Sequence, residues 1–154
     1  MTIGCFSGYS KPKVLAEAEL SVLSKSAYLM DERSQTVVFS SNEEKRLPIA
    51  SMCKIMTLLL CFDALNSGEI KIDEQITVSQ TAAGMGGSQV FLEANADYSV
   101  GELIKSITVA SANDACVAMA EKLCGSESAF VDKMNNKVKE LNLNNTVFVN
   151  CTGL

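Results

Sequence analysis

An apolar segment, SMCKIMTLLLCFDALNSG at residues 51–68, constrains the fold more than any other feature of the chain. It follows Pro48, runs for about four turns and ends at Gly68, a pattern typical of a helix. Because apolar residues lie nearly all round this helix, we expect it to be buried at the centre of the fold. One lysine, Lys54, interrupts the segment three residues after Ser51.

The other elements predict a mixed α/β (α+β) domain without internal repeats. SAYLMD (26–31) and TVVFS (36–40) flank a polar turn and predict a β-hairpin. We expect an extended segment at 70–80, a glycine-rich loop at 82–91 and an extended tail, TVFVNCTGL. Helices are expected after the capping residue Ser99, over 113–125, and from Ser126 or Ser128 onwards. Residues 1–25 are interpreted as a leader or linker remnant, with the domain at 26–154.

Composition excludes several classes of function. The chain has 154 residues, a net charge of −5 and no histidine. An acidic chain without clustered lysine and arginine is not expected to bind nucleic acid. Histidine-based dyads, triads and most catalytic zinc sites are impossible, and no metal or cofactor is expected. The six cysteines contain no C-x-x-C pair and are interpreted as reduced core residues.

The N-terminus does not predict an intact signal peptide. MTIGCFSGYSKPKV has neither a basic region nor a long apolar run. No segment reaches about 18 consecutive apolar residues, so we expect no membrane-spanning helix and see no membrane anchor in this chain.

Ser51 and Lys54 have the spacing and surroundings of a nucleophile and its base. Residues i and i+3 share one face of a helix, so the lysine amine can reach the serine hydroxyl. Apolar neighbours disfavour the charged ammonium, and a neutral amine can act as a base. The helix start also offers N–H groups to a developing oxyanion. The alternative is a lysine whose amine extends into water beside an inert serine.

A second cluster, Ser111-Ala112-Asn113, stands between two predicted helices. Taken alone, Ser111 or Asn113 predicts a helix N-cap. Taken together, RLPIASMCKIMT and the stretch from SVGELIKSITVASANDA to the C-terminal TGL resemble the serine D-alanyl-D-alanine carboxypeptidases. These are low-molecular-mass penicillin-binding proteins of the β-lactamase and transpeptidase fold. The resemblance covers about residues 27–154.

This resemblance implies roles for four residues. Ser51 would be the acylated nucleophile and Lys54 its general base. Ser111 would relay a proton to the leaving D-alanine, and Asn113 would bind the substrate amide. The implied substrate is a peptidoglycan stem peptide ending in D-Ala-D-Ala, outside the cytoplasmic membrane, and β-lactams would be covalent inhibitors.

The chain departs from the family pattern in one respect. The third motif, Lys-Thr-Gly or Lys-Ser-Gly, does not occur in these 154 residues. We therefore expect this chain alone to hydrolyse D-Ala-D-Ala peptides poorly. Two alternatives stay open: a non-catalytic penicillin- or peptidoglycan-binding module, and a class A β-lactamase in which Glu140-Leu141-Asn142-Leu143-Asn144 forms the deacylating loop. Because Glu140 ends a predicted helix, the β-lactamase alternative is the weaker one.

Overall fold

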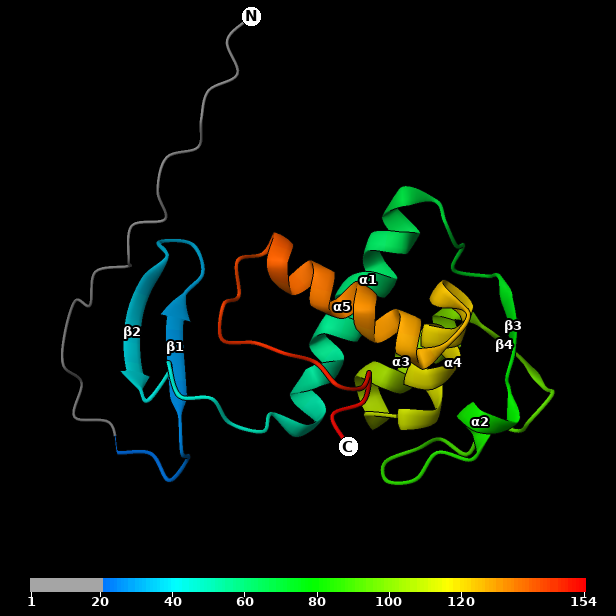
Figure 1. The fold of residues 1–154 in the computed structure, drawn as a ribbon, viewed down its shortest axis with the longest axis horizontal. Coiled ribbons are helices and arrows are strands. Elements are labelled where there is room, and N and C mark those ends of the chain that lie inside the picture. Colours follow the sequence, from blue (N-terminus) through cyan, green and yellow to red (C-terminus); the bar gives the residue numbers. More distant parts are fainter. Residues whose placement is uncertain (1–20) are drawn as a thin grey trace, which may run out of the picture. The chain divides into compact units, whose positions relative to one another are not determined.

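The computed structural model describes residues 21–154. The chain divides into two compact units, one ending at Arg46 and one spanning Leu47–Leu154. Most of the predicted leader lies outside the described residues. Each unit is considered by itself below (Figure 1).

The first unit is the predicted β-hairpin. β1 (Ala27–Asp31) pairs antiparallel with β2 (Thr36–Ser41), and a register shift falls between Leu29 and Met30. Asp31 closes the turn, because its Oδ1 accepts hydrogen bonds from the Ser34 backbone N–H at 2.7 Å and from the Ser34 hydroxyl at 2.6 Å. These bonds also hold the pKa of Asp31 below its ordinary value.

The apolar segment forms a helix, as predicted, but its first turn is tighter than expected. A 3-10 turn, η1 (Ala50–Cys53), leads into α1 (Lys54–Ser67), and Gly68 ends α1 in the left-handed conformation at φ 77°. The expectation of burial on every side is wrong. Met52, Ile55 and Phe62 are 64%, 66% and 47% exposed. The opposite face is buried.

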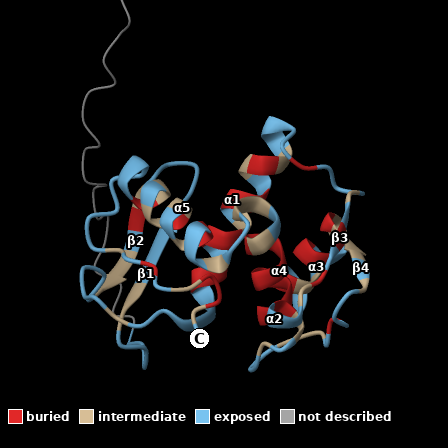
Figure 2. Ribbon diagram, turned by 45° about the vertical axis from the view of Figure 1, so that its right-hand side comes forward, coloured by how far each residue is buried: buried red, intermediate tan, exposed pale blue. Residues whose placement is uncertain are grey.

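The centre of the second unit is α4 (Asn113–Cys124) instead. It contacts four other helices: α1, α2 (Gln80–Ala83), α3 (Val100–Ala110) and α5 (Glu127–Glu140). Residues 113–120 are all buried, and Figure 2 shows this buried surface along α4. Small side chains such as Ala115 and Ala118 let neighbouring helices approach from several sides. Side-chain size, rather than hydrophobicity alone, therefore decides which helix is central.

The two helices flanking α4 begin as predicted. Ser99 caps α3 in a capping box, in which its hydroxyl accepts from the Glu102 N–H while the Glu102 carboxylate accepts from the Ser99 N–H. Between the two candidate caps of α5, the structure uses Ser126, which accepts from the Ala129 N–H. The buried residues of α3 are Val100, Leu103, Ile104 and Ile107.

Extended structure is scarcer than the sequence predicts. Within 70–80 only β3 (Gln75–Thr77) is a strand, paired antiparallel with β4 (Asp97–Ser99), which the sequence did not indicate. The short helix α2 was not predicted either. The tail from Thr146 onwards is irregular, with bends at 149–152 and no strand, and side chains from α1 and α5 bind its backbone groups. The tail predicted to be extended therefore forms no strand.

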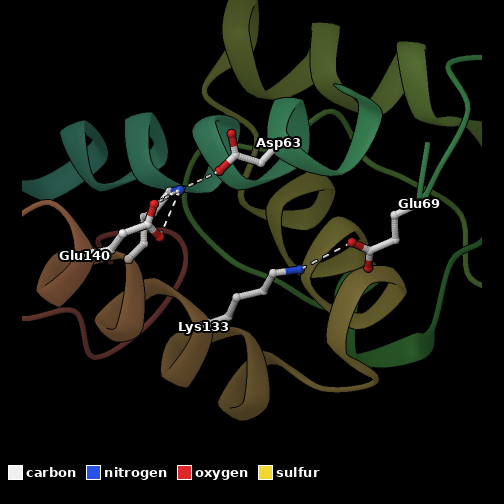
Figure 3. A network of polar contacts seen from close by, with 5 residues as sticks. Asp63, Glu69, Lys133 and Glu140 are labelled. Carbon is white, nitrogen blue, oxygen red and sulfur yellow. Dashed lines mark hydrogen bonds and ion pairs between the residues drawn. The ribbon is translucent and has the colours of Figure 1, made fainter. Parts of the chain in front are cut away.

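Ion pairs join α1 and α5 where α5 lies across α1 (Figure 1). The Lys137 amine lies 2.9 Å from Asp63 and 3.1 Å from Glu140, and Lys133 lies 3.6 Å from Glu69 just beyond α1 (Figure 3). Because these carboxylates are largely exposed, each pair contributes at most about 1 kcal/mol. The network orients α5 more than it stabilises the fold.

One helical stretch in the described part, Ala50–Ser67, has the length and mean hydropathy, 1.2, of a membrane span. The sequence analysis expected a helix here but no membrane-spanning helix. It also carries Lys54 and Thr57, which are buried and hydrogen-bonded to the 151–152 backbone. These polar contacts identify it as a core helix of the second unit.

Candidate active site

Ser51 and Lys54 meet at the junction of η1 and α1. Ser51 is exposed, whereas Lys54 is only 3% exposed. The Lys54 amine lies 3.2 Å from the Ser51 hydroxyl oxygen and donates a 2.8 Å hydrogen bond to the carbonyl of Thr152. The alternative in which this lysine extends into water is therefore wrong. An accessible hydroxyl stands beside a buried amine, as a lysine-activated serine requires.

The local backbone explains this alignment. Ser51 lies in the 3-10 turn η1 and Lys54 begins α1 three residues later, so the two side chains share one face of the continuous helical stretch. Ala50 starts the turn at φ 47°, a left-handed conformation that an alanine rarely adopts. Gly153 lies against this residue so closely that an added Cβ would be 1.9 Å from the Ala50 carbonyl oxygen. The residue before Ser51 is thus held in an unfavourable conformation by its surroundings.

The turn that carries the Thr152 carbonyl is fixed by two helices. The Thr57 hydroxyl of α1 donates a 2.7 Å bond to the Cys151 carbonyl, and the Cys151 N–H donates a 3.1 Å bond to Glu127 of α5. Thr57 and Thr152 are fully buried, at 0% and 1% exposed. Sequence reasoning missed these contacts. The only available signal was a turn-forming Asn followed by Gly three residues later.

Ser111 and Asn113 occupy the link between α3 and α4. Ser111 ends α3 at φ 55°, and among the described residues no hydrogen bond joins its hydroxyl to Ser51 or Lys54. Ala112 is the N-cap of α4 and makes no side-chain cap bond. The prediction that Ser111 or Asn113 is a helix N-cap is therefore wrong, because Ser111 is the C-cap of α3 and Asn113 is the first residue of α4.

Asn113 faces the glycine-rich loop. Its side-chain N–H donates a 2.7 Å bond to the Gly86 carbonyl, and its backbone N–H donates a 2.7 Å bond to the Ser88 carbonyl. Gly87, at φ 77°, approaches so closely that an added Cβ would be 2.8 Å from the Asn113 amide nitrogen. The glycines of this loop therefore serve a tight turn and a close approach. The Asn113 side chain thus uses its N–H to hold the loop at Gly86.

Asp114 is a buried carboxylate that sequence reasoning did not single out. It is 0% exposed and accepts hydrogen bonds from the backbone N–H groups of Val90 at 3.1 Å, Leu92 at 3.1 Å and Ala115 at 2.9 Å. Between the two loop residues, Phe91 is held at φ 58° with its side chain 76% exposed. Asp114 thus clamps the loop beside Asn113.

The thiols near Lys54 are neutral. Burial raises the pKa of Cys116 to about 12, although the charge of Lys54 opposes this shift. Burial likewise raises the pKa of Cys53, with Lys54 again opposing. Because a thiol attacks only as the thiolate, neither cysteine competes with Ser51 as a nucleophile. Within residues 21–154, no group of three or more His, Cys, Asp or Glu could hold a metal ion.

Comparison with known proteins identifies the family. Residues 13–154 match the family model described as D-alanyl-D-alanine carboxypeptidase. The chain belongs to this family. The D-alanyl-D-alanine carboxypeptidase DacF of Bacillus subtilis is 48% identical over 148 residues, covering 96% of this chain and 38% of the relative. The chain thus spans less than half the length of this relative.

Solved structures of the carboxypeptidase family share the fold. The D-alanyl-D-alanine carboxypeptidase DacD of Francisella tularensis matches with a TM-score of 0.87 and 34% identity, over 94% of this chain and 35% of that one. Penicillin-binding protein D2 of Listeria monocytogenes, solved in an ampicillin-bound form, matches with a TM-score of 0.74 and 27% identity, over 84% of this chain and 52% of that one. The predicted penicillin-binding-protein fold is confirmed.

Glu140, the residue behind the β-lactamase alternative, ends α5 as the sequence predicted. Its carboxylate pairs with Lys137 at 3.1 Å, and its side chain is 66% exposed. This arrangement matches a solvated helix end and leaves Glu140 without the loop that a deacylating carboxylate needs.

Proposed function

We propose that the whole protein is a serine-type D-alanyl-D-alanine carboxypeptidase, and that this chain supplies its nucleophile and base. The main observation behind this proposal is that the buried Lys54 amine lies 3.2 Å from the exposed Ser51 hydroxyl. The chain's membership of the carboxypeptidase family supports the same reaction. The proposed substrate is a peptidoglycan stem peptide ending in D-Ala-D-Ala, which places the protein outside the cytoplasmic membrane.

Acylation begins with proton transfer from Ser51 to Lys54. The serine oxygen attacks the carbonyl carbon of the penultimate D-alanine and forms a tetrahedral oxyanion near the N-terminal N–H groups of η1 and α1. Collapse of this intermediate breaks the C–N bond to the terminal D-alanine. The proton passes from Lys54 through the Ser111 hydroxyl to the leaving amine, and free D-alanine departs. In this step the Asn113 oxygen accepts a hydrogen bond from the substrate amide.

Deacylation repeats the chemistry with water as the nucleophile. Lys54 removes a proton from the water, and the resulting hydroxide attacks the ester carbonyl on Ser51. The C–O bond to Ser51 breaks, and Lys54 returns the proton to the serine oxygen. The shortened peptide leaves as a carboxylic acid.

A β-lactam enters by the same attack, because its ring amide presents a reactive carbonyl to Ser51. Ring opening keeps the leaving amine tethered to the acyl group, so the adduct persists. The ampicillin-bound form of the Listeria monocytogenes relative supports β-lactams as covalent inhibitors of this protein too.

Labelling of the full-length protein with a fluorescent penicillin tests the proposal. Wild type should form a covalent adduct, and Ser51→Ala should form none. Lys54→Met should slow labelling by about 100-fold or more, the range for loss of a general base. Ser10→Ala and Lys13→Ala are matched controls, since they alter the other Ser-x-x-Lys pair of the sequence, and both should label normally. Undiminished labelling of Ser51→Ala would contradict the proposal.

The lifetime of the adduct separates the two enzyme classes. A carboxypeptidase should keep the penicilloyl group for minutes or longer and release D-alanine from a D-Ala-D-Ala peptide. Fast penicillin hydrolysis without D-alanine release would instead identify a β-lactamase.

A further inference from the structure

We propose that Asn150 is a positioning residue for the general base, because its side chain holds the Thr152 carbonyl against the Lys54 amine. The inference rests on the proposed function of Ser51 and Lys54. It concerns how the Lys54 amine is oriented, because the Asn150 side chain itself contacts neither Ser51 nor Lys54.

Asn150 folds the turn that follows it. Its side-chain oxygen accepts hydrogen bonds from the Gly153 N–H at 2.6 Å and the Thr152 N–H at 3.2 Å, and lies 3.4 Å from the Thr152 hydroxyl. Its side-chain N–H donates a 2.9 Å bond to the Leu154 carbonyl. One side chain therefore sets the orientation of the peptide groups on both sides of Thr152.

The rest of the turn is fixed by other residues. Thr57 and Glu127 bind the backbone of Cys151, and Gly153 lies against Ala50. None of these contacts holds the peptide that carries the Thr152 carbonyl, whose following N–H belongs to Gly153. Thr152 is 1% exposed, so water cannot reach its own N–H without disturbing the packing, and the Gly153 N–H is half-buried. Loss of that acceptor would free this peptide to rotate.

The Thr152 carbonyl decides where the Lys54 lone pair points. A neutral amine has two N–H groups and one lone pair. With one N–H donated to the Thr152 carbonyl at 2.8 Å, rotation about the terminal C–N bond is restricted. The lone pair can then face the Ser51 hydroxyl at 3.2 Å and accept its proton. Asn150 thus acts on the base through the backbone of Thr152.

The test compares four forms of the full-length protein: wild type, Asn150→Leu, Asn150→Asp and the control Asn135→Leu. Leucine is similar in size to asparagine but has no acceptor, whereas aspartate keeps the acceptor oxygen. Asn135 binds the backbone of Phe148 in the same segment, with its oxygen accepting from the N–H at 2.9 Å and its nitrogen donating to the carbonyl at 2.8 Å. Asn135 does not bind Thr152. The Asn135→Leu control therefore distinguishes a general loosening of the segment from a change in the orientation of the Lys54 amine.

The readout is penicillin acylation per active site, measured by stopped flow over a range of penicillin concentrations. This design separates the acylation rate constant from the affinity of the non-covalent complex. Asn150→Leu should lower the rate constant about 10- to 100-fold with little change in affinity, because misplacement of a catalytic group by about 1 Å has effects of this size. Asn150→Asp should stay within about threefold of wild type, and Asn135→Leu should lose stability while keeping its rate constant.

Two results would overturn the inference: an unchanged acylation rate constant in Asn150→Leu, or an equal fall in Asn135→Leu. If Asn150→Leu does not fold, Asn150→Ala replaces it, since alanine also lacks the acceptor oxygen, and an unchanged rate constant there counts against the inference too. Failure of the proposed function looks different, because wild type itself would then form no adduct on Ser51.

Discussion

Gly153→Ala is a direct test of the close packing beside Ser51. An added Cβ would lie 1.9 Å from the Ala50 carbonyl oxygen and 2.4 Å from its carbon. Ordinary carbon–oxygen contacts start at about 3.3 Å, so the two segments must separate by about 1.4 Å. Gly153 also has φ +79°, a conformation that costs an L-residue about 1–2 kcal/mol. Overpacking adds about 1–3 kcal/mol.

We therefore expect Gly153→Ala to lower the free energy of unfolding by about 2–5 kcal/mol, as measured by urea unfolding. Because the displaced residue precedes Ser51, penicillin acylation per folded molecule should also fall by about 100-fold. The assay is the stopped-flow measurement described above, with the folded fraction determined by circular dichroism.

Gly125→Ala is the matched control. Gly125 has φ +77°, but no atom lies within 4 Å of its added Cβ. It should therefore lose only the conformational part, about 1–2 kcal/mol, and acylate at the wild-type rate. Equal stability losses and equal acylation rates in the two variants would refute the argument that Gly153 is needed for its close approach to Ala50.

Two further predictions concern buried groups. Asp114→Ala should lower the free energy of unfolding, measured with urea, by about 3 kcal/mol or more, because three backbone N–H groups lose an acceptor. The control is Asp97→Ala, which removes an exposed carboxylate bonded to Thr77. It should cost less than about 1 kcal/mol in the same experiment. Stability should also fall at alkaline pH. Burial raises the pKa of Cys61 from 9.0 to about 12, so above pH 9 the unfolded chain releases a proton that the folded state keeps. Each such thiol lowers the free energy of unfolding by about 1.4 kcal/mol per pH unit up to its folded pKa. Cys61→Ala should therefore make the fall in the free energy of unfolding between pH 9 and 12 shallower by about 1.4 kcal/mol per pH unit. An unchanged slope would show that Cys61 does not contribute to this fall.

Local patterns predicted the individual elements well. The hairpin, the helix ending at Gly68, the Ser99 cap and α4 all depend on residues that are close in sequence, so their turn and capping signals are visible there. The short helix α2 and the strand β4 were missed because each has only a few residues and depends on a distant partner, as when β4 pairs with β3. Element length thus limited the prediction.

Burial was harder to predict than secondary structure. The hydrophobicity of residues 51–68 suggested the central helix, but the small residues of α4 allow closer packing on more sides. The tail was predicted to be extended, but it pairs with no strand. Its backbone instead bonds to Thr57, Glu127 and Asn135, which lie far away in the sequence.

The sequence by itself determined the nucleophile candidate, the base candidate and the family, because a three-residue spacing on a helix and two short motifs are local properties. Only the tertiary structure decided that the Lys54 amine is buried beside Ser51 and not in water. That outcome depends on the Thr152 carbonyl, which comes from 98 residues further along the chain. An apolar helix can bury a lysine only where folding brings an acceptor to its amine, and no local pattern specifies that acceptor.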